Sequence, residues 1–177
     1  MPPAQEPLSW VPLSAHLHLV APPVAAAAGL VPEARVAQID PDLADTAAFC
    51  TAYDVAPQAS ANCVVVDGRR AERSVHAAVM VLAVDRADIN RVVRKQLDLR
   101  KLSFMGAAQA EALTGMRAGG ITPVGLPADW VVLVDAAVAR AGPVVVGAGV
   151  RAAKLLLDGA DLAALPNARV LDLALPR

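Results

Sequence analysis

A stretch rich in glycine and proline, Thr114–Pro127, has the residue types best suited to chemistry carried by the main chain. It holds four of the 11 glycines of the sequence, with apolar side chains between them. The pair Gly119 and Gly120 lets the backbone approach another group closely, because no Cβ stands in the way. Pro123 and Pro127 fix φ and favour an extended residue before each of them. A stiff loop that presents bare peptide groups to a ligand is one interpretation, and a tight corner between two elements is the other.

Few side chains offer an alternative to this main-chain chemistry. Cys63 begins the apolar run Cys63–Val66 and would be the nucleophile of a small-ester or amide hydrolase, although free cysteines in such runs are more often inert core residues. His16 and His18 alternate, but no further cluster of Cys, His or Asp completes a metal site around them. No Ser/His/Asp or Cys/His set has a recognisable spacing. We therefore expect neither a metal nor another cofactor.

One segment is locally basic. Asp85–Lys101 contains six Lys or Arg residues against three Asp residues, a local charge of +3. Such a run is usually a solvated face. It is also the best site in the chain for contacts with phosphate groups, through Arg91, Arg94, Lys95 and Lys101.

The elements that must position these residues are indicated by apolar periodicity. A hairpin is expected across the charged tip Arg69–Arg73, and Asp88 is expected to cap a helix over Asp88–Leu97. Another helix is expected to begin at Asp40 and to end at about Phe49–Tyr53. Strands outnumber helices and their order is mixed, which predicts an α/β (α+β) fold with a curved mixed β-sheet or partial barrel flanked by helices.

Length and composition limit the classes of protein. A chain of 177 residues with 56% hydrophobic residues can bury one sizeable core, so we expect a flexible N-terminus over residues 1–10 and a single domain over residues 11–177. The net charge of −1 argues against binding nucleic acid through overall positive charge. Two cysteines, no basic leader and no apolar segment of spanning length lead us to expect a cytoplasmic protein with no membrane partner.

From about Ser60 to Leu173, the sequence resembles the YbaK/EbsC family, which includes the editing domain inserted into some bacterial prolyl-tRNA synthetases. Four stretches carry the resemblance in order: Ser60–Val66; Leu82–Asn90 through Leu102–Phe104; Thr114–Met116 with Gly119–Gly125; and Val144–Leu157. In the third, as in the family's glycine loop, a glycine precedes a proline by four positions. The resemblance implies a single YbaK-like domain.

The resemblance also implies an activity and partners. The family's proteins cleave the ester that joins a wrong amino acid to the terminal adenosine of tRNA, a quality-control step of translation that is needed because synthetase pockets discriminate similar amino acids by only a few kcal/mol. The implied function is that of a trans-acting aminoacyl-tRNA deacylase whose attacking group is a ribose hydroxyl or a water. The implied partners are the aminoacylated acceptor end of tRNA and an aminoacyl-tRNA synthetase.

Site residues follow from the same resemblance, except that the basic residues are named for the local charge described above and Arg151 for its place in a turn after Gly149, where exposure to solvent is the alternative. Gly119, Gly120, Thr122 and Pro123 would form the wall that holds the oxyanion and the adenosine, and Asn62 would orient the substrate. The residues expected to bind other parts of the substrate are Gly125, Gly147, Gly149, Arg151, Lys101, Arg91, Arg94 and Lys95.

Three positions depart from the family's pattern. Asn62 stands where the family commonly has a lysine, Gly147 where it often has a serine, and Lys154 where many relatives have an acidic residue. An asparagine offers hydrogen bonds but no charge. The alternative function is therefore a diverged protein that binds tRNA or aminoacyl-adenosine without hydrolysis, with Lys101 or Lys154 as candidates for a cation supplied from elsewhere.

Overall fold

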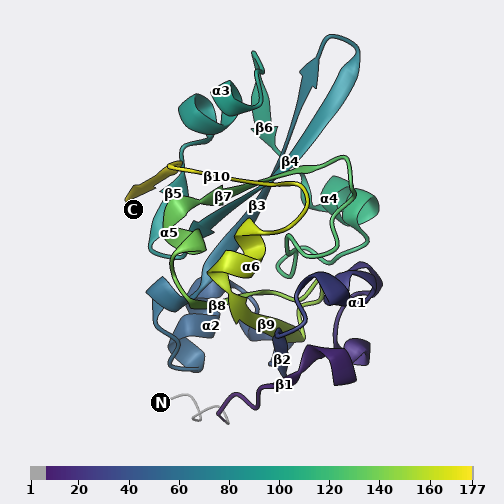
Figure 1. Ribbon diagram of the computed structural model, residues 1–177, viewed down its shortest axis with the longest axis vertical. Coiled ribbons are helices and arrows are strands. Elements are labelled where there is room, and N and C mark those ends of the chain that lie inside the picture. Colours follow the sequence, from purple (N-terminus) through teal and green to yellow (C-terminus); the bar gives the residue numbers. More distant parts are fainter. Residues whose placement is uncertain (1–6, 177) are drawn as a thin grey trace.

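The computed structural model describes residues 7–176, and its largest sheet has five strands in the order β10-β7-β4-β3-β6 (Figure 1). The long strands β3 (Ala61–Arg70) and β4 (Arg73–Leu82) form the expected antiparallel hairpin. On one side of it, β7 (Val131–Asp135) and β10 (Ala168–Leu171) add in parallel. On the other side, β6 (Leu102–Phe104) pairs antiparallel with β3. The sheet is thus mixed, as predicted.

A second sheet of four antiparallel strands packs beside the first. Its order is β1 (Val11–Pro12), β2 (Arg35–Gln38), β9 (Ala153–Asp158) and β8 (Pro143–Gly147). A third, small sheet joins β5 (Asp85–Ala87) to β11 (Ala174–Pro176). This mixed α/β architecture confirms the predicted fold class, and the sheets do not close into a barrel within residues 7–176.

Six short α-helices cover the sheets in the described part of the chain. They are α1 (Pro22–Ala27), α2 (Thr46–Ala52), α3 (Arg94–Gln96), α4 (Ala107–Thr114), α5 (Ala136–Ala139) and α6 (Gly159–Ala163). α4 ends as expected at Gly115, which has the left-handed conformation typical of a helix C′ position. Asp88 caps the helical segment that leads into α3, accepting a hydrogen bond from the Arg91 N–H at 3.2 Å.

The expected helix from Asp40 is in fact broken. Asp40 accepts a hydrogen bond from the Asp42 N–H at 2.9 Å, but it caps only a 3₁₀ turn over Pro41–Leu43. The chain then becomes extended at Asp45 (φ −63°, ψ 135°), and α2 begins afresh at Thr46. The break places Asp45 and Thr46 at the start of a helix, where both line the cavity described below.

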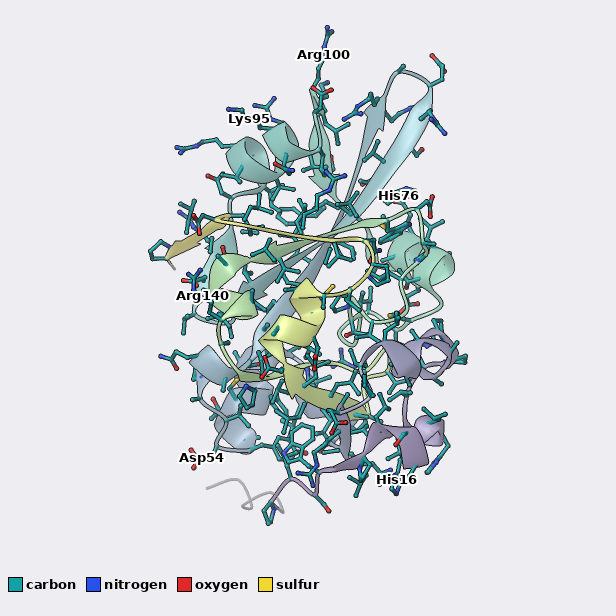
Figure 2. All side chains as sticks on the ribbon, in the orientation of Figure 1. His16, Asp54, His76, Lys95, Arg100 and Arg140 are labelled. Carbon is teal, nitrogen blue, oxygen red and sulfur yellow. The ribbon has the colours of Figure 1, made fainter. Side chains whose placement is uncertain are left out.

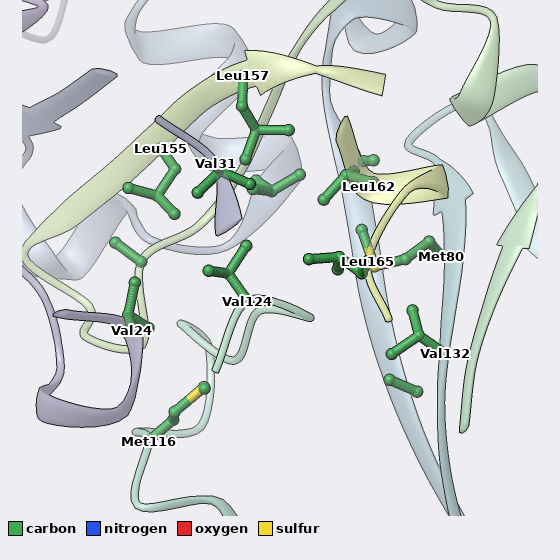
Figure 3. Close-up of a cluster of buried hydrophobic side chains, with 14 of the residues drawn as sticks. Val24, Val31, Met80, Met116, Val124, Val132, Leu155, Leu157, Leu162 and Leu165 are labelled. Carbon is green, nitrogen blue, oxygen red and sulfur yellow. The ribbon is translucent and has the colours of Figure 1, made fainter. Parts of the chain in front are cut away.

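The back of the glycine loop is anchored in the main core (Figure 3). Met116 and Val124 of the loop pack in one cluster with Val24 of α1 and Leu155 and Leu157 of β9. Both loop side chains are almost fully buried. Apolar burial on one side therefore holds the loop rigid while its other side remains free to face a ligand.

The start of the chain is described from Pro7 onwards, so most of the predicted flexible segment 1–10 lies outside the described residues. Leu8 and Trp10 pack partly buried against the cluster around Phe49. Over the described part of the chain, no helix has the length and apolar character needed to cross a bilayer.

Candidate functional site

A cavity of about 510 Å³ opens where the start of β3, the start of α2 and the glycine loop meet β8 and β9. Its size is that of a site for a small ligand. The polar side chains on its wall are those of Asp45, Thr46, Asn62 and Lys154. The remaining lining residues are small or apolar: Ala44, Ala47, Ala61, Cys63, Val65, Met105, Ala107, Ala110, Ala118, Gly119, Ile121 and Gly147.

Asn62 is held by a hydrogen bond from the neighbouring helix. The Thr46 hydroxyl donates to Asn62 Oδ1 at 2.5 Å. This bond occupies the carbonyl side of the amide and leaves the NH₂ group as the donor that Asn62 can offer to a ligand. Asn62 therefore orients an acceptor oxygen and carries no charge.

The edge of β3 is open beside this asparagine. β6 pairs only with Val66–Gly68, and the Met105 N–H donates to the carbonyl of Val65 at 3.0 Å. Because successive residues of a strand alternate the direction of their peptide groups, those of Cys63 point to the same side as those of Val65, away from β4. Within residues 7–176 no strand pairs with β3 at Cys63 on this side, so the cavity meets the open edge of β3 as well as the glycine loop.

The two central glycines of the loop have different roles. Gly120 is buried, its N–H donates to the Arg117 carbonyl at 2.9 Å, and its own carbonyl accepts from the Gly149 N–H at 2.7 Å. Gly119 has a φ of +85° and lines the cavity, and its N–H has no hydrogen-bond partner within residues 7–176. Of these two glycines, it is therefore Gly119 whose N–H is left for a ligand, whereas Gly120 fixes the loop.

Gly147 of β8 packs directly against the main chain of the glycine loop. A methyl group at this position of β8 would lie 2.7 Å from the Ile121 carbonyl oxygen and closer still to that of Gly120. Both atoms are main-chain atoms, so they cannot swing aside as the end of a side chain would. The glycine at 147 is what lets the loop lie directly on β8.

The other predicted loop residues lie behind the wall and do not line the cavity. Thr122 and Pro123 are buried, and the Thr122 hydroxyl has no hydrogen-bond partner within residues 7–176. Gly125 (φ +90°) packs on the Pro23 main chain, and Gly149 (φ +78°) packs on Ala21 and Val24. Their positive φ angles suit glycine, and they shape the loop at Gly125 and the connection between β8 and β9 at Gly149.

Charged groups form one side of the cavity. The Lys154 Nζ donates to the Ala44 carbonyl at 2.7 Å and lies 5.1 Å from the centre of the Phe49 ring. Arg151 stands at the rim, where its Nε donates to the Pro41 carbonyl at 3.1 Å and its Nη1 lies 3.9 Å from Asp45 Oδ1. Desolvation by burial lowers the pKa of Lys154, helped by the nearby Arg151 charge and opposed by Cys50 and Asp45.

Sequence reasoning missed Asp45 and Thr46 as cavity residues and named Lys154 only as one of two candidate cations. It placed Asp45 and Thr46 inside a continuous helix. The Asp-Thr pair is itself a common helix start, and that signal could have identified the break. Lys154 enters the cavity through strand pairing far along the chain, which no local pattern reports.

The four basic residues Arg91, Arg94, Lys95 and Lys101 lie apart from the cavity, on and beside α3 and β6 at the upper end of the molecule (Figures 1 and 2). A second hollow of about 520 Å³ bridges the two regions. Its lining includes Asn62 and Val64 of β3, the charged residues Asp85, Arg86, Asp88 and Arg91, Asn90, and Phe104, which is 68% exposed. Asn62 belongs to both hollows.

Cys63 does not have the properties of a nucleophile. Desolvation raises the pKa of its thiol to about 12. At neutral pH the group is therefore protonated, whereas a catalytic cysteine needs a lowered pKa.

One comparison identifies a family, and solved structures match the fold. The model of the aminoacyl-tRNA editing domain family matches residues 40–165. A solved hypothetical protein superposes with a TM-score of 0.71 at 22% identity over 80% of this chain and 91% of its own. A proposed trans-editing enzyme for prolyl-tRNA synthetase superposes with a TM-score of 0.71 at 18% identity, over 87% of this chain and 98% of its own. No curated protein matches the chain.

Proposed function

Because the chain belongs to the aminoacyl-tRNA editing domain family, we propose that it is a trans-acting aminoacyl-tRNA deacylase that removes a wrongly attached amino acid in the cavity beside Asn62. The reaction is the hydrolysis of the ester between the amino acid and the terminal ribose. Its place in the cell is the cytoplasm, where tRNA is charged and used. The resemblance of the sequence to the YbaK/EbsC family leads to the same proposal.

The observation that carries the proposal is the meeting of Asn62, Gly119 and Gly147 at one cavity, although they are far apart in sequence. Asn62 offers an amide donor, and Gly119 offers an unpaired N–H in a rigid loop. Donors that are already aimed at an acyl oxygen stabilise the negative charge that ester hydrolysis places on it. The site therefore supplies the electrostatic part of the reaction.

The attacking oxygen comes from water, which the terminal ribose hydroxyl of the substrate helps to position. The water oxygen bonds to the acyl carbon, the ester C–O bond breaks, and the ribose oxygen leaves with a proton that the water gave up. The products are the free amino acid and tRNA with its terminal hydroxyl restored. No redox partner or further co-reactant is needed.

The second hollow provides a route for the acceptor end. Asn62 stands between the two hollows, Arg91 lines the second, and the exposed Phe104 offers a flat face on which a base can stack. Beyond it, Arg94, Lys95 and Lys101 would meet backbone phosphates, which position an RNA without reading its sequence. This arrangement supports entry of the 3′ end from the α3 side.

The test is deacylation of a panel of mischarged tRNAs by the full chain. We expect turnover above the uncatalysed rate for at least one of them, and loss of turnover in Asn62→Ala. Absence of turnover with every member at high enzyme concentration would overturn the proposal. Asn62→Asp is an informative companion, because a carboxylate of the same shape cannot donate the NH₂ hydrogen bonds.

A second candidate is binding without hydrolysis, and the occupied carbonyl of the uncharged Asn62 is the observation that favours it. It predicts salt-dependent binding of tRNA or of an aminoacyl-adenosine analogue with no release of amino acid. Asn62→Lys would then be expected to introduce activity. Turnover by the unaltered protein rejects this candidate, and absence of tRNA binding at low salt rejects both.

A further inference from the structure

Lys154 is a buried ammonium group that makes no direct ion pair within the described part of the chain. Its side chain is 6% exposed, and within residues 7–176 no Asp or Glu oxygen lies within 4.0 Å of its Nζ. The Nζ donates one hydrogen bond, to the Ala44 carbonyl, and faces the Phe49 ring. An ammonium has three donors, so two remain. Because Lys154 lines the cavity, these donors are available to whatever fills it.

The groups around Lys154 make this wall positive. Arg151 and Lys154 carry two positive charges, and Asp45, which pairs with Arg151, carries one negative charge. The remaining titratable neighbour is the Cys50 thiol, whose pKa is raised by burial and which therefore stays neutral. A buried lysine without an ion pair costs stability unless a ligand offsets it. This side of the cavity therefore favours a ligand group that carries a negative charge, or that gains one during a reaction.

Strand pairing places Lys154 beside the glycine loop. Its cross-strand partner on β8 is Gly147, the residue on which the carbonyls of Gly120 and Ile121 rest. Lys154 and the unpaired N–H of Gly119 therefore belong to the same side of the cavity. The α-ammonium of an aminoacyl ester would be repelled by Lys154 and suits the exposed Asp45 carboxylate at the rim.

We propose that the Lys154 ammonium, together with the Gly119 N–H, binds the acyl carbonyl oxygen and stabilises the negative charge that forms on it. The inference rests on the proposed deacylase function and names the cation of that same site. When the water oxygen bonds to the acyl carbon, the carbonyl electron pair moves onto this oxygen. It returns as the ester C–O bond breaks. Lys154 keeps its proton throughout and acts only by charge and hydrogen bonding.

Kinetics of Lys154→Met, which replaces the lysine by an unbranched side chain one atom shorter and without charge, give the first test. We expect kcat to fall about 10²–10³-fold, as when an oxyanion donor is removed, with KM changed only a few-fold. Lys154→Arg should recover part of the loss, and the exposed Arg140→Gln serves as a matched control for loss of a cation. The kcat of the unaltered protein, corrected for the uncatalysed rate, should fall at alkaline pH as Lys154 loses its proton. This fall should begin below pH 10.5, because the pKa of Lys154 is lowered, and it should be absent in Lys154→Met.

Two unreactive analogues separate this role from a structural one. An amide-linked aminoacyl-adenosine imitates the bound substrate, and a phosphonate-linked analogue carries the negative oxygen of the transition state. We expect Lys154→Met to weaken phosphonate binding at least about tenfold more than amide binding. Equal weakening of both analogues, or unchanged kcat, would overturn the inference while leaving the deacylase function intact. If no mischarged tRNA is hydrolysed, the deacylase function fails, and the analogue pair still decides whether Lys154 recognises a negative oxygen.

Discussion

Gly147→Ala tests whether direct contact between β8 and the glycine loop builds the site. The added methyl would lie 2.7 Å from the Ile121 carbonyl oxygen and closer to that of Gly120. An ordinary carbon–oxygen contact is about 3.4 Å, so the loop must move by roughly 0.7 Å at Ile121 and further at Gly120. No positive φ complicates the change, because Gly147 lies within a regular strand.

The size of the effect follows from this displacement. Overpacking a rigid contact costs about 1–3 kcal/mol, which for a chain of this length lowers the Tm by roughly 2–12 °C. A displacement approaching 1 Å at the Gly119 N–H is expected to lower kcat/KM for deacylation by about 10²-fold. The loss in activity should therefore exceed what the loss in stability explains at 25 °C.

The assay pairs thermal unfolding with single-turnover deacylation of the best substrate in the panel. Gly29→Ala is the matched control, since a Cβ there meets nothing within 4 Å and should leave both measurements close to those of the unaltered protein. If Gly147→Ala matches this control in Tm and in kcat/KM, the loop does not rest on β8 as described, and the reasoning on Gly119 and Lys154 fails with it.

Three further outcomes are expected. Lys154→Met should raise the free energy of unfolding at pH 7 by an amount on the order of 1 kcal/mol. The stability advantage of Lys154→Met should shrink as pH rises towards 10.5. Above the lowered pKa of Lys154 in the folded protein, only the unfolded chain keeps this proton, so the unaltered protein becomes more stable with rising pH. Denaturant titrations from pH 7 to 10.5 measure both free energies of unfolding, and a difference between the two proteins that grows with pH would contradict this expectation. Lys95→Gln and Lys101→Gln should each weaken tRNA binding and reduce its log–log salt slope by about 1. Arg140→Gln should not, because Arg140 lies lower in the molecule, away from the upper end that carries Lys95 (Figure 2). Iodoacetamide at pH 8 should leave Cys63 unmodified in the folded protein, as read by mass spectrometry, and rapid labelling would return Cys63 to consideration as a nucleophile.

Local sequence was sufficient for the main elements and for the identity of the loop. Two apolar runs on either side of the charged segment Arg69–Arg73 located the β3–β4 hairpin, and glycine chemistry located the end of α4 at Gly115. These features depend on neighbours a few residues apart, where steric limits on φ and ψ and the period of apolar burial act directly. The break before Thr46 was missed for a related reason, because two adjoining short helices share the pattern of one long one.

The composition of the site depended on contacts between distant parts of the chain. Asn62, Gly119 and Lys154 become neighbours only through the pairing of β8 with β9 and the packing of the loop on Gly147. The same packing assigned different roles to Gly119 and Gly120, which are equivalent by sequence, since only one of the two N–H groups is taken by Arg117. The sequence alone thus determined that a stiff glycine loop would exist. Tertiary packing decided which of its peptide groups, and which cation, face the cavity. Hydrogen-bond partners and burial depend on contacts between residues far apart in the chain, and no local pattern encodes these contacts.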